Sequence, residues 1–220
     1  MRTIRALTAA AALMTALPGL ATAQEGRQFR DSWFWGLKLG GFSYADSSGS
    51  YHQAPLIGAE WLITRTQGGL YIAGTQGYLT TQTLFAANLN NPDSTFRSVN
   101  LKNVRRLDVA GVGFPGHYGK WHPYVAAGIS MVQVAGASAQ GNYNSVDEFA
   151  ITQAVIQATR VSFTPLVMAG AQYRLKKVSV FGQLLLLGVN ENWILFNGRS
   201  LMPSYEIGVR YNIGSSIAKD

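Results

Sequence analysis

The chain has 220 residues, of which 47% are hydrophobic and only 13% are charged, and it contains 24 glycines and no cysteine. The hydrophobic content excludes an intrinsically disordered chain, and the lack of cysteine excludes a disulfide scaffold and a cysteine-based zinc site. The formal net charge of +7 comes from scattered basic residues, so we expect no nucleic-acid partner. Soluble domains contain about 25% charged residues. The shortfall indicates a chain whose surface is not everywhere in contact with water.

Residues 1–23 have the pattern of a secretory signal peptide. Arg2 and Arg5 form a basic start, residues 6–17 are apolar, and small residues lead up to Ala23. The apolar run is shorter than the ~20 residues that a membrane-spanning helix requires. We therefore expect an exported protein that is cleaved after Ala23.

The rest of the chain alternates between apolar and polar residues with a period of two. Near the start, for example, Trp35, Leu37 and Leu39 alternate with Gly36 and Lys38. This pattern is typical of strands with one apolar and one polar face. Eight such segments can be drawn, over residues 33–44, 55–65, 69–85, 97–114, 121–138, 149–175, 177–188 and 203–213.

The first part of the sixth segment has two interpretations. Residues 147–160 fit an amphipathic helix in a loop, but Phe149, Ile151 and Val155 continue the alternation of the strand that follows. The β-branched residues here favour a strand, and we therefore expect one. The third to sixth segments would then form two hairpins that extend beyond the ~9–11 residues needed to cross lipid.

The connections between the segments alternate strictly between short and long. Short turns follow the second, fourth and sixth segments, and longer polar links follow the others. This alternation is typical of a transmembrane barrel with short periplasmic turns and longer extracellular loops. We predict an all-β fold, an eight-stranded antiparallel up-and-down transmembrane β-barrel over residues 24–213, followed by a short tail over residues 214–220.

A soluble eight-stranded barrel is the alternative fold. It would have to enclose its charged side chains in the core or cluster them on a nearly uncharged outer surface. A barrel in lipid places these side chains in a polar lumen, where opposite charges can pair, and this favours the membrane barrel. The predicted polar network of the lumen consists of Lys38, Glu60, Asp108, Gln172, Gln183, Glu206 and Arg210.

Two further groups of residues are candidates for contact with lipid. Aromatic residues near the short-turn ends of the segments fit an interfacial girdle, and basic residues near the longer hairpins fit contacts to lipopolysaccharide phosphates. The girdle candidates are Trp33, Trp35, Trp61, Trp121, Tyr173 and Tyr211, and the lipopolysaccharide candidates are Arg97, Lys102, Arg105 and Arg106.

Four segments carry a resemblance to one family. Residues 35–42, 121–129, 169–175 and 205–213 resemble the first, fifth, sixth and closing strands of small outer-membrane β-barrel, or porin-family, domains of Gram-negative bacteria. The resemblance implies a bacterial outer-membrane location and a single barrel over the mature chain. The chain departs from the family at Ile213, because such chains usually end on an aromatic residue that the insertion machinery reads.

Catalytic and metal-binding chemistry has few candidates. His52 lies in the first long link close to Asp46 and several serines, which makes a lipid A hydrolase the sharpest enzymatic hypothesis. A loop with several serines is usually only a solvated loop, so we do not expect an enzyme. His117 and His122 lack a third metal ligand, and we expect no metal and no cofactor.

The expected function is structural or interactive. Eight strands leave an interior just wide enough for side chains, so we expect a plugged lumen and a role in envelope integrity, adhesion or partner binding through extracellular hairpins. A narrow or gated porin-like transport path is the alternative. The expected partners are outer-membrane lipid, lipopolysaccharide and an extracellular protein, and we expect a monomer.

Overall fold

The computed structural model describes residues 29, 31–46, 49–65, 68–86, 96–115, 119–141, 143, 146–189, 193–195 and 200–215. The expected signal peptide and residues 216–220 of the expected tail lie outside these described residues. No helix in the described part of the chain is long and apolar enough to cross a membrane.

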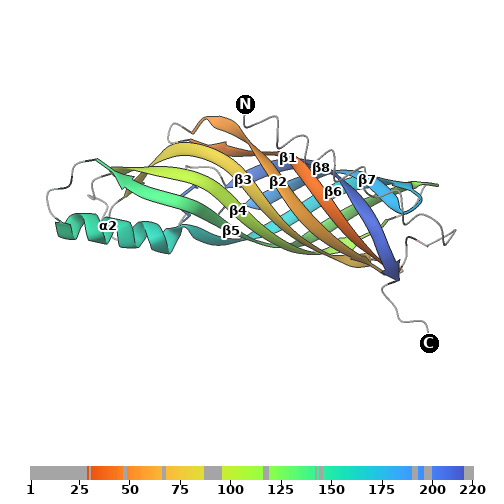
Figure 1. Ribbon diagram of the computed structural model, residues 1–220. Coiled ribbons are helices and arrows are strands. Elements are labelled where there is room, and N and C mark those ends of the chain that lie inside the picture. The colour runs from red at the N-terminus through yellow and green to blue at the C-terminus, as the bar shows by residue number, and fades with distance from the viewer. Residues whose placement is uncertain are drawn as a thin grey trace, which may run out of the picture.

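Eight strands form one closed barrel, in which each strand pairs antiparallel with its neighbours in the sequence and β8 pairs with β1 (Figure 1). The predicted eight-stranded, up-and-down β-barrel is therefore confirmed. The strands are β1 (Ser32–Ala45), β2 (Tyr51–Thr64), β3 (Gly68–Ala86), β4 (Phe96–Gly113), β5 (Trp121–Gln140), β6 (Val161–Leu175), β7 (Val178–Gly188) and β8 (Leu201–Ser215), and one helix, α2 (Val146–Thr159), lies between β5 and β6.

The alternation of the sequence sorts side chains to the two sides of the barrel wall. In β1, Trp35, Leu37 and Leu39 point outward and are 52%, 62% and 57% exposed, whereas Phe34 and Lys38 point inward and are buried. Successive side chains of a strand lie on opposite faces of a sheet. The apolar face therefore becomes the outer surface, and the polar face becomes part of the interior.

Three strands extend the wall at one end of the barrel. The pairing of β2 with β3 stops at Leu56 and Gly77, and the pairing of β5 with β6 stops at Gln133 and Val161, but β3, β4 and β5 stay paired beyond these points. The extension, which we call the projecting sheet, lies at the left of Figure 1, and the short turns lie at the right. Asn103 has a positive φ of 57° where the register of β3 and β4 shifts, so the alternation of inward and outward residues changes here.

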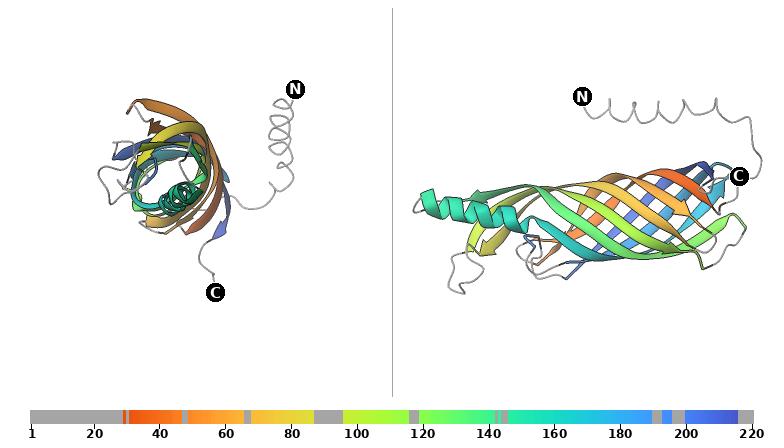
Figure 2. Two further views of the ribbon diagram at one scale, coloured as in Figure 1. Left: turned by 90° about the vertical axis from the view of Figure 1, so that its left-hand side faces the viewer. Right: turned by 90° about the horizontal axis from the view of Figure 1, so that it is seen from below.

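Helix α2 corrects the expectation of a strand over residues 147–160. It lies beside β5 (Figure 1). The side chain of Ile156 is fully buried. The acidic side chains of Asp147 and Glu148 lie in its first turn, where they interact favourably with the helix dipole. In the end view of Figure 2, α2 lies within the outline of the barrel. The side views of Figure 1 and Figure 2 show α2 running along the projecting sheet, so the chain returns beside β5 to the barrel before it enters the wall as β6.

Candidate functional site

A layer of charged and polar side chains crosses the middle of the barrel, and we call it the ionic layer. The seven residues predicted for the lumen all lie in it, and each is at most 4% exposed. The structure brings them together with three residues that the sequence analysis did not assign to the lumen. The members are Lys38, Glu60, Tyr71, Arg106, Asp108, Tyr124, Gln172, Gln183, Glu206 and Arg210.

Lys38 is surrounded by two acids and a phenol. Its Nζ lies 2.8 Å from Glu206 Oε2 and 4.0 Å from Asp108 Oδ2, and it donates a 2.9 Å hydrogen bond to the Tyr71 hydroxyl. The side chains of Lys38, Asp108 and Glu206 have no exposed surface. Because an unpaired buried charge is strongly destabilising, each of these groups depends on the others.

Arg210 makes the second cationic centre of the layer. Its Nε forms an ion pair with Glu60 Oε1, and its Nη1 donates a 2.6 Å hydrogen bond to Gln172 Oε1. The guanidinium group lies 3.9 Å from the ring centre of Phe181, which is a cation–π contact. The residue is 1% exposed, so the whole guanidinium is enclosed by protein.

Two phenols and an amide connect these centres. The Tyr71 hydroxyl donates to Glu60 Oε2 at 3.1 Å, and Gln183 Nε2 donates to the Tyr71 hydroxyl at 3.0 Å and to Glu206 Oε2 at 2.7 Å. The Tyr124 hydroxyl donates to Gln183 Oε1 at 2.8 Å. The layer is therefore one continuous hydrogen-bonded network rather than a set of separate pairs.

Arg106 was predicted to contact lipopolysaccharide, and this prediction is wrong. The side chain is 6% exposed, its Nε lies 2.9 Å from Asp108 Oδ2, and its Nη2 forms an ion pair with Glu206. The physical reason is strand alternation, because residues two apart lie on the same face and Asp108 points inward. Arg105, the adjacent residue, points outward instead.

The ionic layer is electrically neutral. Its three cations are matched by three anions, and every one of them lies within an ion pair. The charged members are Lys38, Arg106 and Arg210, against Glu60, Asp108 and Glu206. A neutral layer has no excess charge that would draw ions into the interior.

An aromatic cluster closes the barrel below the ionic layer, at the short-turn end. Phe29, which precedes β1, lies with its ring centre 5.6 Å from Phe34, 4.9 Å from Phe114 and 4.2 Å from His122. The Thr64 hydroxyl donates a 2.6 Å hydrogen bond to the Phe29 carbonyl and holds this segment in place. His122 is 7% exposed. It therefore packs inside this end of the barrel.

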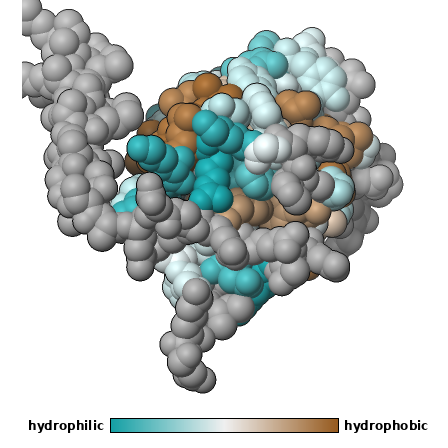
Figure 3. All heavy atoms as spheres, turned by 90° about the vertical axis from the view of Figure 1, so that its right-hand side faces the viewer, coloured by the Kyte–Doolittle hydropathy of each residue, from teal (hydrophilic) through white to brown (hydrophobic). Residues whose placement is uncertain are grey.

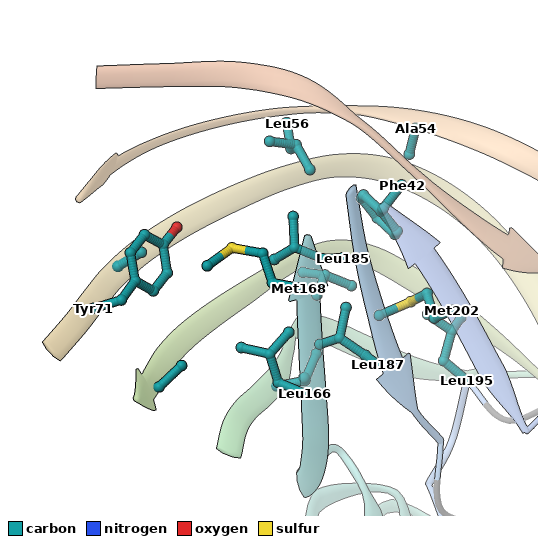
Figure 4. Packing of buried hydrophobic residues seen from close by; sticks show 14 of the residues in the cluster. Phe42, Ala54, Leu56, Tyr71, Leu166, Met168, Leu185, Leu187, Leu195 and Met202 are labelled. Atoms are coloured by element: carbon teal, nitrogen blue, oxygen red, sulfur yellow. The ribbon is translucent and has the colours of Figure 1, made fainter. Parts of the chain in front are cut away.

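An aliphatic cluster closes the barrel above the ionic layer. Figure 4 shows its side chains converging from β1, β2, β6, β7 and β8. Trp193, Ile194 and Leu195, from the connection between β7 and β8, are each 3% exposed, and Trp193 Nε1 donates a 3.3 Å hydrogen bond to the Arg160 carbonyl. The labelled members of the cluster include Phe42, Leu56, Leu166, Met168, Leu185, Leu187, Leu195 and Met202.

Two inward-facing glycines leave room for the ionic layer. A Cβ atom on Gly36 would lie 2.9 Å from Glu60 Cγ, and one on Gly170 would lie 2.7 Å from both Cζ and the hydroxyl oxygen of Tyr124. Real Cβ atoms almost never approach other atoms this closely. Any larger residue at these positions would push a member of the network out of place.

The girdle candidates lie on the outer face of the wall and pair with one another. The Trp61 ring centre lies 5.1 Å from that of Trp33 and 5.4 Å from that of Trp35, and the Trp121 and Tyr173 ring centres are 5.1 Å apart. The remaining candidate, Tyr211, is partly exposed. A view of the short-turn end shows hydrophilic residues near the middle and hydrophobic residues on the flanks (Figure 3).

The other lipopolysaccharide candidates lie on β4. Lys102 and Arg105 are exposed, and Arg105 Nε donates a 3.3 Å hydrogen bond to Gln76 Oε1 on β3. The side chain of Arg97 lies outside the described residues. Lys102 and Arg105 therefore remain available on the outer face, whereas Arg106 does not.

The histidine of the first long link is paired with an acid. His52 Nε2 lies 2.8 Å from Asp46 Oδ2, and these side chains are 50% and 27% exposed. Among the described residues, no serine hydroxyl is hydrogen-bonded to His52. The described residues contain no group of three or more potential metal ligands. The nucleophile–base contact that a serine hydrolase uses is thus not seen in the described part of this link.

Comparisons with known proteins give structural matches only. No protein-family model matches the sequence. The comparison with curated proteins finds no match. Neisserial surface protein A aligns with a TM-score of 0.55 and 12% identity, over 82% of this chain and 97% of that protein.

Two further solved structures align less closely. The attachment invasion locus protein Ail of Yersinia pestis aligns with a TM-score of 0.46 and 7% identity, over 84% of this chain and 100% of that one. The outer membrane protein OprG from Pseudomonas aeruginosa gives 0.46 and 10%, over 84% of this chain and 98% of that one. The structural neighbours are small outer-membrane barrels, so the resemblance seen in the sequence is confirmed at the level of the fold.

Proposed function

We propose that this chain is a non-enzymatic protein of the bacterial outer membrane, with its short turns, the start of β1 and the end of β8 on the periplasmic side. The outward-facing residues support a lipid environment. Every strand contributes exposed apolar side chains, whereas the charged side chains of the ionic layer point inward. Such a surface in water would be a very large exposed apolar patch. The proposal includes cleavage after Ala23 and a monomeric barrel with a closed lumen.

We further propose that the projecting sheet is the functional surface, and that it binds an extracellular protein by strand addition. The observation that carries this proposal is the free edge of β3. Its pairing with β2 ends at Gly77, yet the strand continues to Ala86. From Tyr78 to Gln82, the backbone on this edge has no partner strand among the described residues. An extended peptide segment can satisfy such groups by joining the sheet.

The composition of the free edge favours a protein partner. Residues 78–83 contain no charged residue and no proline, and Tyr78, Thr80 and Gln82 are exposed. Edge strands are normally protected against pairing by lysine, proline or a very short length. This edge has none of these protections, so it is suited to pair with a second strand.

A matched pair of substitutions tests this proposal. Gln82 on the β3 edge pairs with Asn100 on β4, which is the central strand of the projecting sheet. Gln82→Lys places a charge on the free edge, whereas Asn100→Lys places the same charge where both neighbouring strands are already present. We expect cells displaying the Gln82→Lys variant to adhere several-fold less to surfaces coated with extracellular-matrix proteins, and Asn100→Lys cells to adhere normally.

Folding of both variants is checked by the difference in gel mobility between unboiled and boiled samples. Equal adhesion of the two variants would contradict strand addition at the β3 edge. The adhesive function itself would be contradicted if cells that display the unmodified protein adhered no better than cells without it.

A further inference from the structure

Four basic residues gather at the short-turn end of the barrel, on two neighbouring turns. Lys120 precedes β5, Arg174 lies near the end of β6, and Lys176 and Lys177 form the turn between β6 and β7. The Arg174 N–H donates a 2.9 Å hydrogen bond to the Lys120 carbonyl, and Arg174 Nε donates a 3.2 Å hydrogen bond to the Lys176 carbonyl. The first bond joins the two turns, and the second lies within the turn between β6 and β7. We call the four residues the basic turn cluster.

The basic turn cluster has no acidic partner within the described part of the chain. None of its members forms an ion pair with another described residue, whereas at the same end of the barrel Arg65 lies 3.9 Å from Asp31. The described acids of the lumen are already paired within the ionic layer. Lys120 and Lys176 are exposed, and Arg174 and Lys177 are partly exposed. The cluster therefore presents positive charge that no described acid neutralises.

The cluster lies directly beside the lipid-facing surface of the proposed membrane barrel. The Trp121 and Tyr173 rings, 5.1 Å apart, follow Lys120 and precede Arg174, and Leu175 and Val178 are 48% and 38% exposed. Paired aromatic rings of this kind favour the boundary between hydrocarbon and headgroups. The basic side chains next to them are then at the depth of lipid phosphates.

The conformation of the turn gives a separate indication. Lys176 has a φ of +57°, in the left-handed region that glycine or asparagine adopts at lower cost. A lysine at this position is unfavourable for the turn itself. A lysine here is explained if its positive charge binds an anionic group.

We propose that the basic turn cluster binds the phosphate of an anionic phospholipid headgroup in the periplasmic leaflet. The guanidinium of Arg174 can donate two parallel hydrogen bonds to phosphate, and the lysines add mobile positive charges around it. The inference rests on the proposed membrane location and orientation. The alternative ligand is the cell-wall polymer, whose carboxylates would bind the cluster away from the bilayer.

A matched pair of double variants tests the proposal in the full folded chain. Lys176→Asn/Lys177→Gln removes two charges from the cluster, with asparagine chosen because it tolerates the left-handed conformation. Lys102→Gln/Arg105→Gln removes two charges at the other end of the barrel. The probes are phosphatidylglycerol and phosphatidylcholine, titrated against detergent-solubilised protein and counted as retained lipid by native mass spectrometry.

We expect the unmodified protein to retain phosphatidylglycerol in preference to phosphatidylcholine, and the Lys176→Asn/Lys177→Gln variant to bind phosphatidylglycerol about 30-fold more weakly. The Lys102→Gln/Arg105→Gln variant should keep the preference. A third variant, Lys176→Asn/Lys177→Arg, keeps one of the two charges. It should bind phosphatidylglycerol more tightly than Lys176→Asn/Lys177→Gln does.

Three results would overturn the proposal. They are equal retention of the two lipids by the unmodified protein, equal weakening in the two double variants, and binding of isolated cell-wall polymer in place of phosphatidylglycerol. Failure of the membrane proposal is a separate observation, because the unmodified chain would then show no gel-mobility shift and would not insert into vesicles of either lipid.

Discussion

The interior of the barrel combines two kinds of packing that respond differently to change. The ionic layer joins six charges in one network of ion pairs, and it lies between the aromatic cluster around Phe29 and the aliphatic cluster around Leu187. In the apolar clusters each side chain contributes through the volume it fills. In the ionic layer each group also depends on a specific partner. Hydrophobic side chains thus pack on both sides of the ionic layer, and the ion pairs of the layer connect β8 with β1, β2 and β4.

Breaking one ion pair should have the largest effect on stability. Arg210→Ala leaves Glu60 buried without its cation, and we expect this to lower the free energy of unfolding by about 3–5 kcal/mol. Urea unfolding in lipid vesicles, followed by tryptophan fluorescence, measures the change. The double variant Arg210→Met/Glu60→Leu removes both charges and should recover most of the loss. A double variant as unstable as Arg210→Ala would show that volume, and not pairing, dominates this layer.

A cavity in the aliphatic cluster should have the next largest effect. Leu187 is fully buried, and Leu187→Ala should lower the free energy of unfolding by about 3 kcal/mol through lost contacts and an unfilled cavity. The adjacent Leu186 points outward and is 44% exposed. In the same unfolding measurement, Leu186→Ala should cost less than half as much. Equal effects would mean that the inside and the outside of β7 are packed alike.

Removing one hydroxyl should have a smaller effect. The Tyr124 hydroxyl donates to Gln183 and accepts a 3.3 Å hydrogen bond from Arg210 Nη2, so Tyr124→Phe should cost about 1 kcal/mol. The matched control is Tyr205→Phe, because Tyr205 lies on the outer face and is 49% exposed. If both substitutions had the same effect on unfolding, the buried Tyr124 hydroxyl would contribute no more to stability than an exposed one.

The barrel and much of the lumen could be predicted because both depend on a period of two. Lys38, Glu60 and Arg210 each occupy a polar position between outward-facing apolar residues, which marks them as inward-facing. Tyr71 and Tyr124 carried no such signal, since a phenol fits either side of a membrane wall. Arg106 was missed because it was assigned by its place near a hairpin rather than by its spacing from Asp108.

The elements that close the barrel could not be predicted from alternation. Phe29 and Trp193 lie in connections that have no period, so their inward positions depend on the finished barrel. In α2, Phe149, Ile151 and Val155 imitate the alternation of a strand. The helix forms because Ile156 is buried at the mouth of the barrel and β5 supplies a surface for packing. Tertiary packing here outweighs the local preference for a strand.

Conductance across a planar lipid bilayer tests the closed lumen most directly. The account predicts no steady current through the inserted, folded protein, because a neutral ionic layer lies between two apolar clusters. It also predicts that Arg210→Ala with Phe29→Ala, which opens the ionic layer and the aromatic cluster together, produces measurable current. Steady ion current through the unmodified protein would contradict the account and would favour a porin-like path.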